Sequence, residues 1–296
     1  MGSSHHMSQP RPRPTSAQPQ PRPTSAQART LPWLLLGLAA GLPASAPGEA
    51  PVPKPPAPVA AVAAGVAAHP PEFGELAAVL ARFPATDPIQ GSLELLLSRQ
   101  STEEHWADQS RATVEVEDGP QGLKVGLSRG GARQALVELR EQTLDPAKHT
   151  PLHNALQALS LNEVSGDLDC AAPLGQDLAL AHAVSVQPAV YLGKPARLLV
   201  LTLPPRLSAE ARKHIKNADS RLSIWIGADG VPLGAEKLEH TRGRFLVLFF
   251  ESLRKQTWTF GHKGNRLFAT RHEVDDSASG MGQDFRNTTV ADLSLR

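Results

Sequence analysis

Hydrophobic and polar residues alternate through most of the last hundred residues of the chain. From residue 184 onward, short segments with an apolar residue at every second position are separated by Gly-, Pro-, Asn- and Asp-containing turns. A period of two is typical of β-strands that bury one face. The predicted strands are 184–192, 197–203, 222–227, 233–240, 244–253, 257–263, 266–274 and 285–295. Because most of the gaps are short, sequential strands should be antiparallel.

Turn residues set the expected limits of these strands. The predicted breaks are Asp229-Gly230, Arg242-Gly243, Gly264-Asn265 and the Ser- and Gly-rich segment 275–282. Pro204-Pro205 should end the strand over 197–203. Ser208 is a favourable cap for a helix over 209–218.

The preceding part of the chain contains segments with the period of a helix and segments with the period of a strand. An apolar stripe over 72–83 predicts a helix that Pro84 closes, and 91–100, 109–118 and 122–128 read as three strands of a hairpin ladder. Helices are expected over 131–144, from Pro151 onward and over 171–180. The order is helix, three strands, helices, two strands, helix and six strands, which predicts an α+β fold with an antiparallel sheet.

The N-terminal quarter has a different composition. Residues 1–28 combine a tag-like start, Met1 to Met7, with a Pro-rich segment in which PRPTSAQ occurs twice, and this composition predicts disorder. Residues 47–71 are almost entirely Pro, Ala and Val and predict an extended linker. The foldable domain is therefore expected over 72–296, a length that suits one domain.

A signal-like segment lies between these two parts, at residues 29–46. Arg29 precedes an apolar run from Leu31 to Leu42, and Ala44-Ser45-Ala46 follows. Positive charge, a short apolar core and an A-x-A ending are the parts of a secretory signal. The run is shorter than the roughly 17–25 residues that span a bilayer. We therefore expect export to the periplasm or cell envelope.

Charge and cysteine content narrow the function classes. The formal net charge is +1, which gives no support for nucleic acid as a partner. Cys170 is the single cysteine, so neither an internal disulfide nor a multi-cysteine zinc site is available, and burial as a small hydrophobic residue is expected.

Several phrases in a fixed order carry a family resemblance. They are Tyr191-Leu192-Gly193-Lys194-Pro195, Pro204-Pro205, Leu222-Ser223-Ile224-Trp225-Ile226, Gly230-Val231-Pro232-Leu233 and the apolar strand ending at Phe249-Phe250-Glu251-Ser252. In this order the chain resembles the periplasmic lipoprotein carriers of the LolA and LolB type and the related RseB (MucB) regulators. The resemblance implies a strongly curved antiparallel half-barrel with helices packed on its concave side.

Relatives of that type use the concave face for acyl chains or for an apolar segment of a protein partner. Here the expected lining is Leu95, Leu97, Leu199, Leu201, Ile224, Ile226, Phe245, Val247 and Phe249, with Trp106 at the mouth. An ordinary two-layer core, filled by the protein's own helices, is the alternative for the same residues. The favoured function is non-enzymatic binding of a lipid, lipoprotein or apolar partner segment, without a cofactor. A structural subunit of an envelope complex, docking a protein partner, is another candidate.

Three further patterns could carry chemistry. Gly126-Leu127-Ser128-Arg129-Gly130 matches the G-x-S-x-G of a serine hydrolase, although that motif belongs to mostly parallel sheets. His149 and His153 have metal-ligand spacing, but Pro151 lies between them and no third ligand is evident, so no metal is expected. Arg212, Lys213 and Lys216 form a basic cluster, which suits either a solvated helix face or contact with a membrane surface.

Overall fold

The computed structural model describes residues 71–101, 106–245, 248–280 and 283–296. The tag-like, Pro-rich and signal-like segments, and the linker up to residue 70, lie outside the described residues. The helices are α1 Pro71–Leu80, α2 Arg129–Leu144, α3 Pro151–Ala158, α4 Leu161–Leu168, α5 Ala171–Leu180 and α6 Ala209–His214. The strands are β1 Ile89–Ser101, β2 Trp106–Asp118, β3 Lys124–Gly126, β4 His182–Tyr191, β5 Lys194–Leu203, β6 Ile215–Ile226, β7 Pro232–Phe245, β8 Leu248–Lys263, β9 Arg266–Gly280 and β10 Gln283–Leu295.

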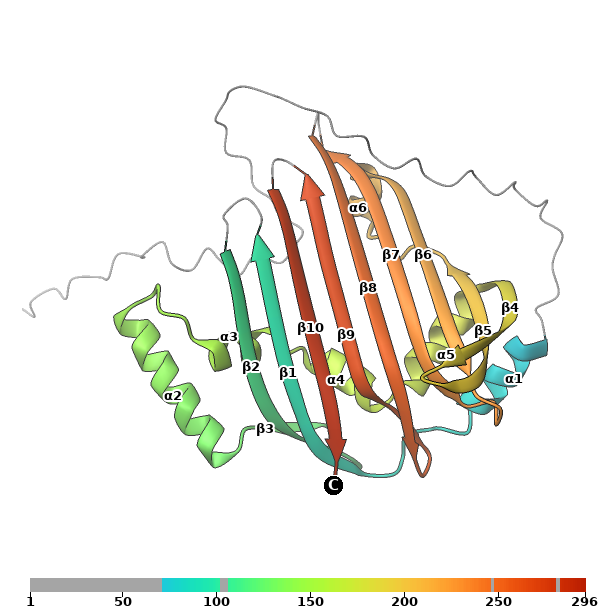
Figure 1. Ribbon diagram of the computed structural model, residues 1–296, viewed down its shortest axis with the longest axis horizontal. Coiled ribbons are helices and arrows are strands. Elements are labelled where there is room, and N and C mark those ends of the chain that lie inside the picture. Colours follow the sequence, from blue (N-terminus) through green and yellow to red (C-terminus); the bar gives the residue numbers. More distant parts are fainter. Residues whose placement is uncertain (1–70, 102–105, 246–247, 281–282) are drawn as a thin grey trace, which may run out of the picture. The chain divides into compact units, whose positions relative to one another are not determined.

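These ten strands form one open sheet in the order β3-β2-β1-β10-β9-β8-β7-β6-β5-β4 (Figure 1). Each pairing among the described strands is antiparallel. The α+β class and the antiparallel sheet predicted from the sequence are therefore confirmed. The pairing of β1 with β10 joins the first hairpin to the last strand, so the sheet depends on a contact between the two ends of the domain.

One face of the sheet carries the core. Directly paired residues share a face, so a single row can be followed across seven strands from register alone. It runs through Leu95, Ala291, His272, Trp258, Ala235, Ile224 and Leu199. Helices α1 and α5 pack on the β5–β7 end of this face, and α3 and α4 pack on its β1, β2 and β10 end. The sheet and the helices thus form two layers around two adjoining apolar clusters.

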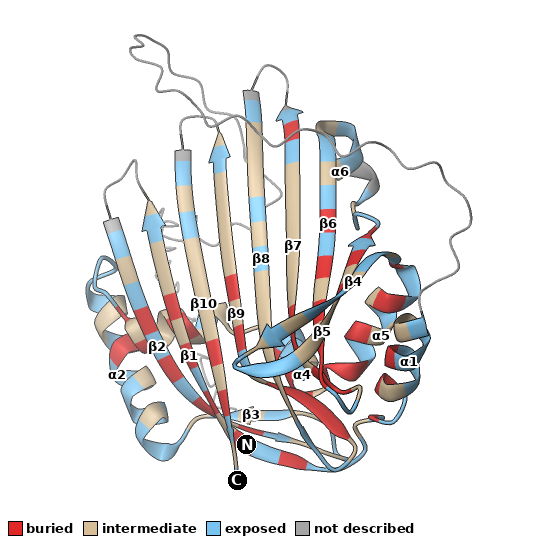
Figure 2. Cartoon of the chain, turned by 45° about the vertical axis from the view of Figure 1, so that its right-hand side comes forward, coloured by how far each residue is buried: buried red, intermediate tan, exposed pale blue. Residues whose placement is uncertain are grey.

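The same face becomes polar toward the hairpin tips. Four residues further along each strand, beyond an intervening mixed row, a polar row contains Arg99, Asn287, Asp276, Arg254, Glu239 and Ser220. Figure 2 shows the consequence, because buried residues concentrate in the half of the strands beside the helices. Only the part of the face that the helices cover is apolar.

Two predicted breaks are wrong, and both lie inside strands. Arg242-Gly243 belongs to β7, and the chain instead reverses between Phe245 and Leu248. Gly243 serves close packing: a Cβ there would collide with the Phe250 ring and with the carbonyl oxygen of His214. The Ser- and Gly-rich segment continues β9 to Gly280, paired on both sides with β8 and β10. The last six predicted strands are therefore five.

Two helix predictions are also corrected. The helix expected over 209–218 ends at His214, because the following residues pair with β7 from Ile215 onward. Sheet hydrogen bonding there outweighs local helix propensity, which is a weak preference. Helix α4 was not predicted at all. Its start carried a signal nonetheless, since Ser160 and Glu163 have the spacing of a capping box, and the Ser160 hydroxyl accepts a hydrogen bond from the Glu163 amide at 3.4 Å.

Candidate functional site: an apolar groove between two helices

The residues expected to line a ligand hollow are mostly covered by the protein's own helices. Leu95, Leu97, Leu199, Leu201, Ile224 and Ile226 are each at most 6% exposed. All but Leu97 belong to the two core clusters, among helix residues such as Leu76, Leu178 and Leu168. An apolar ligand at these side chains would have to displace the helices that cover them.

The remaining predicted lining residues lie at the strand ends. Phe249 faces away from the helices and is 69% exposed, with the Arg244 guanidinium 5.3 Å from its ring centroid. The expected alternation of Phe245 and Phe249 on one face is wrong, because the chain reverses between them and they belong to different strands. Val247 lies outside the described residues. Phe245 ends β7 and Trp106 begins β2, and their side chains also lie outside the described part.

A different apolar surface is open to solvent between α1 and α5. These helices form a groove of about 420 Å³. Its walls are Phe73, Ala77, Leu80, Ala81, Phe83 and Pro84 on the α1 side and Asp169, Ala171, Ala172, Gly175, Leu178 and Ala179 on the α5 side. The volume lies within the roughly 300–1,000 Å³ typical of ligand pockets.

Small residues open this groove. Ala77, Ala81, Ala172 and Ala179 present only a methyl group, and Gly175 presents no side chain. A Cβ added at Gly175 would meet no atom within 4 Å, so the space beside this glycine is empty of protein. Larger residues at these positions would fill the groove without any change to the core beneath it.

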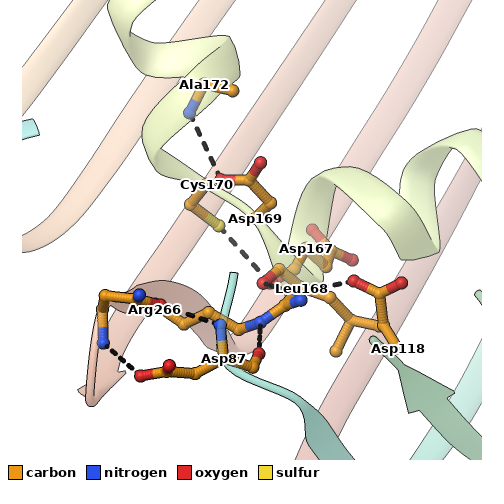
Figure 3. A network of polar contacts seen from close by, with 9 residues as sticks. Asp87, Asp118, Asp167, Leu168, Asp169, Cys170, Ala172 and Arg266 are labelled. Atoms are coloured by element: carbon orange, nitrogen blue, oxygen red, sulfur yellow. Dashed lines mark hydrogen bonds and ion pairs between the residues drawn. The ribbon is translucent and has the colours of Figure 1, made fainter. Parts of the chain in front are cut away.

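A buried arginine fixes the start of α5. Arg266, only 3% exposed, donates to the Asp118 carboxylate at 2.7 Å, to the Leu168 carbonyl at 3.3 Å and to the Asp87 carbonyl at 2.5 Å (Figure 3). The neighbouring Cys170 amide donates to the Leu267 carbonyl at 2.9 Å. The Asp118 carboxylate balances the charge of the guanidinium, and the two carbonyl groups accept further hydrogen bonds from it. These contacts offset the free-energy cost of burying the charge. The α4–α5 connection is therefore held against β9.

The polar chemistry of the groove is sparse. Among its lining residues Asp169 alone is charged, and its carboxylate accepts a hydrogen bond from the Ala172 amide at 3.4 Å, at the start of α5. Cys170 is buried as predicted. Burial raises the pKa of its thiol well above the usual value, and the charges of Asp167 and Asp169 act in the same direction. The thiol is thus held neutral, which suits packing rather than nucleophilic chemistry.

The hydrolase and metal candidates are engaged in local structure. The Ser128 hydroxyl caps α2 by accepting from the Gly131 amide at 3.1 Å. His149 contacts the Asp108 carboxylate at 2.9 Å, whereas His153 contacts Gln157 at 2.9 Å. Pro151 begins α3, so His149 precedes the helix as predicted. Among the described residues, no group of three or more His, Cys, Asp or Glu side chains could hold a metal ion.

Sequence reasoning missed a buried pair between α4 and β9. His272 Nδ1 lies 2.9 Å from the Asp167 carboxylate, and the Trp258 ring stacks on the imidazole with 4.7 Å between centroids. His272 Nε2 is buried without a hydrogen-bond partner in the described structure. Separated by 105 positions, the two residues share no local sequence signal. The pair holds α4 on the sheet.

The basic cluster lies at the end of α6 and the start of β6. Arg212 and Lys213 occupy the last turn of the helix, and Lys216 follows on the strand, all three exposed. Membrane contact through them stays a prediction. None of the helices in the described ranges is long and apolar enough to cross a membrane.

Comparisons with known proteins leave the family open. No protein-family model matches the sequence, and no curated protein matches it either. Among solved structures, a crystal structure of MucB in complex with MucA(peri) is similar over 76% of this chain and 93% of that chain, with 10% identity and a TM-score of 0.13. Similarity at this level does not assign a fold or a function.

Proposed function

We propose that this protein is a non-enzymatic binding protein of the bacterial cell envelope, which holds an acyl chain of a lipid or lipoprotein in the groove between α1 and α5. The observation that carries the proposal is the groove itself, open to solvent and lined almost entirely by apolar side chains. Exposed apolar concavities of this kind are where ligands bind, because burial there removes apolar surface from water.

The chemistry of the lining favours an acyl chain over a peptide. A bound peptide brings amide groups, each of which costs free energy when it is buried without a hydrogen-bond partner. The groove lies between two helices whose backbone groups bond within each helix, and Asp169 is its single charged lining residue. A hydrocarbon chain needs no such partners. The empty space beside Gly175 suits a flexible chain that winds along the groove.

Two finer expectations from the sequence belong to this proposal. The first is that the open sheet is a half-barrel whose concave face is the one that the helices cover. The second is that the signal-like segment directs the protein to the periplasm or cell envelope, where lipids and lipoproteins are available. In this arrangement the ligand binds outside the helices and not against the sheet.

Native mass spectrometry of the full-length protein purified from bacterial cells, followed by lipid extraction, tests the binding. We expect an adduct that extraction identifies as an acyl-chain lipid. Gly175→Leu should fill the groove and lower the bound fraction severalfold. Gly166→Leu is the matched control, since Gly166 is also a helical glycine with no atom within 4 Å of an added Cβ but lies outside the groove. Both changes improve helix propensity, so neither should unfold the protein.

The outcomes separate the candidates. A protein without any adduct, or an adduct that Gly175→Leu leaves unchanged, would contradict the groove as the binding site. A co-purifying protein without lipid would favour the structural envelope subunit.

The non-enzymatic part of the proposal has its own test. The Ser128 hydroxyl accepts a capping hydrogen bond, and we expect no reaction with a fluorophosphonate probe. Labelling of the parent protein that disappears in Ser128→Ala would instead establish a reactive serine. Ser128→Ala also removes the cap of α2, so its free energy of unfolding should fall by about 1 kcal/mol. A loss of this size means that the variant is still folded when its labelling is measured.

A further inference from the structure

Helix α2 is packed with its carboxylate inward and its apolar residues outward. Glu138 is the buried residue of the helix, and its carboxylate accepts hydrogen bonds from the Gln134 side chain and from the His153 amide, both at 3.0 Å. The His153 amide belongs to the first turn of α3, where amides lack partners within the helix and favour negative charge. An ionic cap, rather than an apolar stripe, thus holds α2 against α3.

The consequence is an unusual outer surface. Leu136 is 58% exposed and Leu144 87% exposed, and Val137 and Leu139 are exposed as well. A solvent-facing helix in a globular protein normally keeps such residues on its inner side. Figure 1 shows α2 at the margin of the domain, with no other helix or strand of the described ranges on its outer side.

Positive charge accompanies these apolar side chains. Arg129, Arg133 and Arg140 are exposed and recur at helical spacing on the same outer face as Leu136 and Leu144. Within the described residues none of the three arginines has an ion-pair partner. The carboxylates of the helix are used elsewhere.

Each carboxylate of α2 has an identified contact away from the outer face. Glu138 caps α3, and Glu141 pairs with Lys148 at 3.1 Å. The outer face of α2 therefore combines three arginines with Leu136 and Leu144, is flanked on its two sides by the exposed Val137 and Leu139, and has no carboxylate of its own. We call this surface, with its two flanking residues, the α2 outer face.

From this combination we propose that the α2 outer face docks on the surface of an anionic lipid bilayer. Leucine and valine side chains enter the region between headgroups and acyl chains, while the arginines extend toward the phosphates. Charge complementarity selects this occupant, because the face is uniformly positive and a bilayer containing phosphatidylglycerol is uniformly negative. The surface is separate from the α1–α5 groove and does not depend on the proposed function.

Co-sedimentation of the full chain with lipid vesicles tests the docking. We expect binding to vesicles of phosphatidylcholine with phosphatidylglycerol, weaker binding to phosphatidylcholine alone, and loss of the difference at high salt. Arg133→Glu/Arg140→Glu and Leu136→Gln/Leu144→Gln should each weaken binding to the anionic vesicles by about tenfold or more. Circular dichroism and thermal unfolding confirm that these surface variants stay folded.

The matched control reverses charge at the other basic cluster. Arg212→Glu/Lys213→Glu changes the net charge by the same amount as the α2 arginine variant but lies on α6. Binding that survives this change, while the α2 variants lose it, would assign the docking to α2 and not to the α6 cluster. Because every variant carries the same N-terminal segment, any contribution of that segment cancels.

Three results would overturn the proposal. Folded α2 variants could bind anionic vesicles as well as the parent does, or the α6 variant could be the one that loses binding. A co-purifying acidic protein, lost in the α2 variants while vesicle binding is unchanged, would assign the face to a protein partner instead.

Discussion

The two ends of one sheet face differ in what surrounds them and in what holds them. Beside the helices, a row such as Leu95, His272 and Leu199 lies under α1, α3, α4 and α5 and is almost free of solvent. Where the helical layer ends, the same face carries Arg254, which pairs with Glu163 at the start of α4 at 3.3 Å and with Asp276 of β9 at 3.6 Å. Burial of apolar area stabilises the first region, whereas the partly exposed ion pairs of the second contribute little to stability.

This difference shows how the strands of a sheet can extend beyond the helices that cover one of its faces. The strands continue past the helices because backbone pairing does not require an apolar face. Where no helix covers it, the face uses polar side chains that remain solvated. Of the two alternatives for the apolar face, the burial of Leu95, Leu199 and Leu201 under the helices favours the ordinary two-layer core over a hollow.

The largest expected effect compares one residue from each region. Leu201→Ala removes a fully buried side chain and should cost about 2–5 kcal/mol of unfolding free energy, because a cavity remains among the packed helices. Ser252→Ala, on the same face near the tips, should change it by no more than about 0.5 kcal/mol. Urea unfolding of both variants measures the contrast. Equal losses would mean that the two regions are not distinct.

Strand β4 is an edge strand of the sheet, and a proline limits the hydrogen bonds that its backbone can make at the open edge. Leu192 and Gly193 have φ of 48° and 78°, which suits a two-residue turn, and Tyr191 pairs with Lys194 across it. Alternation from that pair places Pro188 at a position that does not bond to β5. Its nitrogen therefore faces the open edge and withholds an amide from any incoming strand.

Pro188→Val should consequently allow the β4 edges of two copies to pair. Restoring the amide adds a donor in each of two paired copies, and we expect self-association to strengthen by roughly tenfold. Sedimentation velocity over a range of concentrations measures this. Ala189→Val is the control, because position 189 pairs with Ala196 toward β5 and leaves the edge unchanged. Unchanged association of the Pro188 variant would show that the edge is protected by other means.

The smallest effect belongs to the polar end and depends on pH. Burial raises the pKa of Asp276. The nearby Arg254 lowers this pKa, whereas the negative charges of Glu163, Asp275 and Glu239 raise it. A raised folded-state pKa means that the stability contributed by the protonated group is present below the unfolded value, about 3.9, and is lost as pH rises through the folded value. Ionised Asp276 therefore destabilises the fold slightly at neutral pH.

Asp276→Asn should accordingly be more stable than the parent near neutral pH, by less than about 1 kcal/mol because the group is partly solvated. The difference should shrink as the pH falls toward about 4. Urea unfolding of both proteins at a series of pH values provides the measurement. A variant that is less stable than the parent at neutral pH would mean that attraction to Arg254 dominates.

Local patterns predicted some elements well and others poorly. The turn at Asp229-Gly230 and the ladder from β1 to β3 follow from period-two alternation and turn residues, which are local properties. Gly243 and the segment ending at Gly280 misled the prediction because glycine is used there for close packing and within a paired strand. Sequence alone does not distinguish a glycine that turns the chain from one that admits a neighbour's ring.

The candidate sites depended still more on contacts at long range. Helix periodicity predicted α1, α2 and α5, but not that α1 and α5 would leave a groove between them. Nor did it predict that Glu138 would face inward and leave Leu136 exposed, because the amide that Glu138 contacts belongs to another helix. The Asp167–His272 pair had no local signal.

By itself the sequence determined the alternation of faces, the antiparallel strand pairs, the positions of α1, α2, α3 and α5, and the placement of Cys170 in the interior. These follow from the short-range geometry of the backbone and from the exclusion of apolar side chains from water. The tertiary structure decided which apolar faces the helices cover, which remain open, and where β1 meets β10. Those choices depend on packing between segments far apart in the chain, where the competing arrangements have the same local pattern and differ only in the contacts they complete.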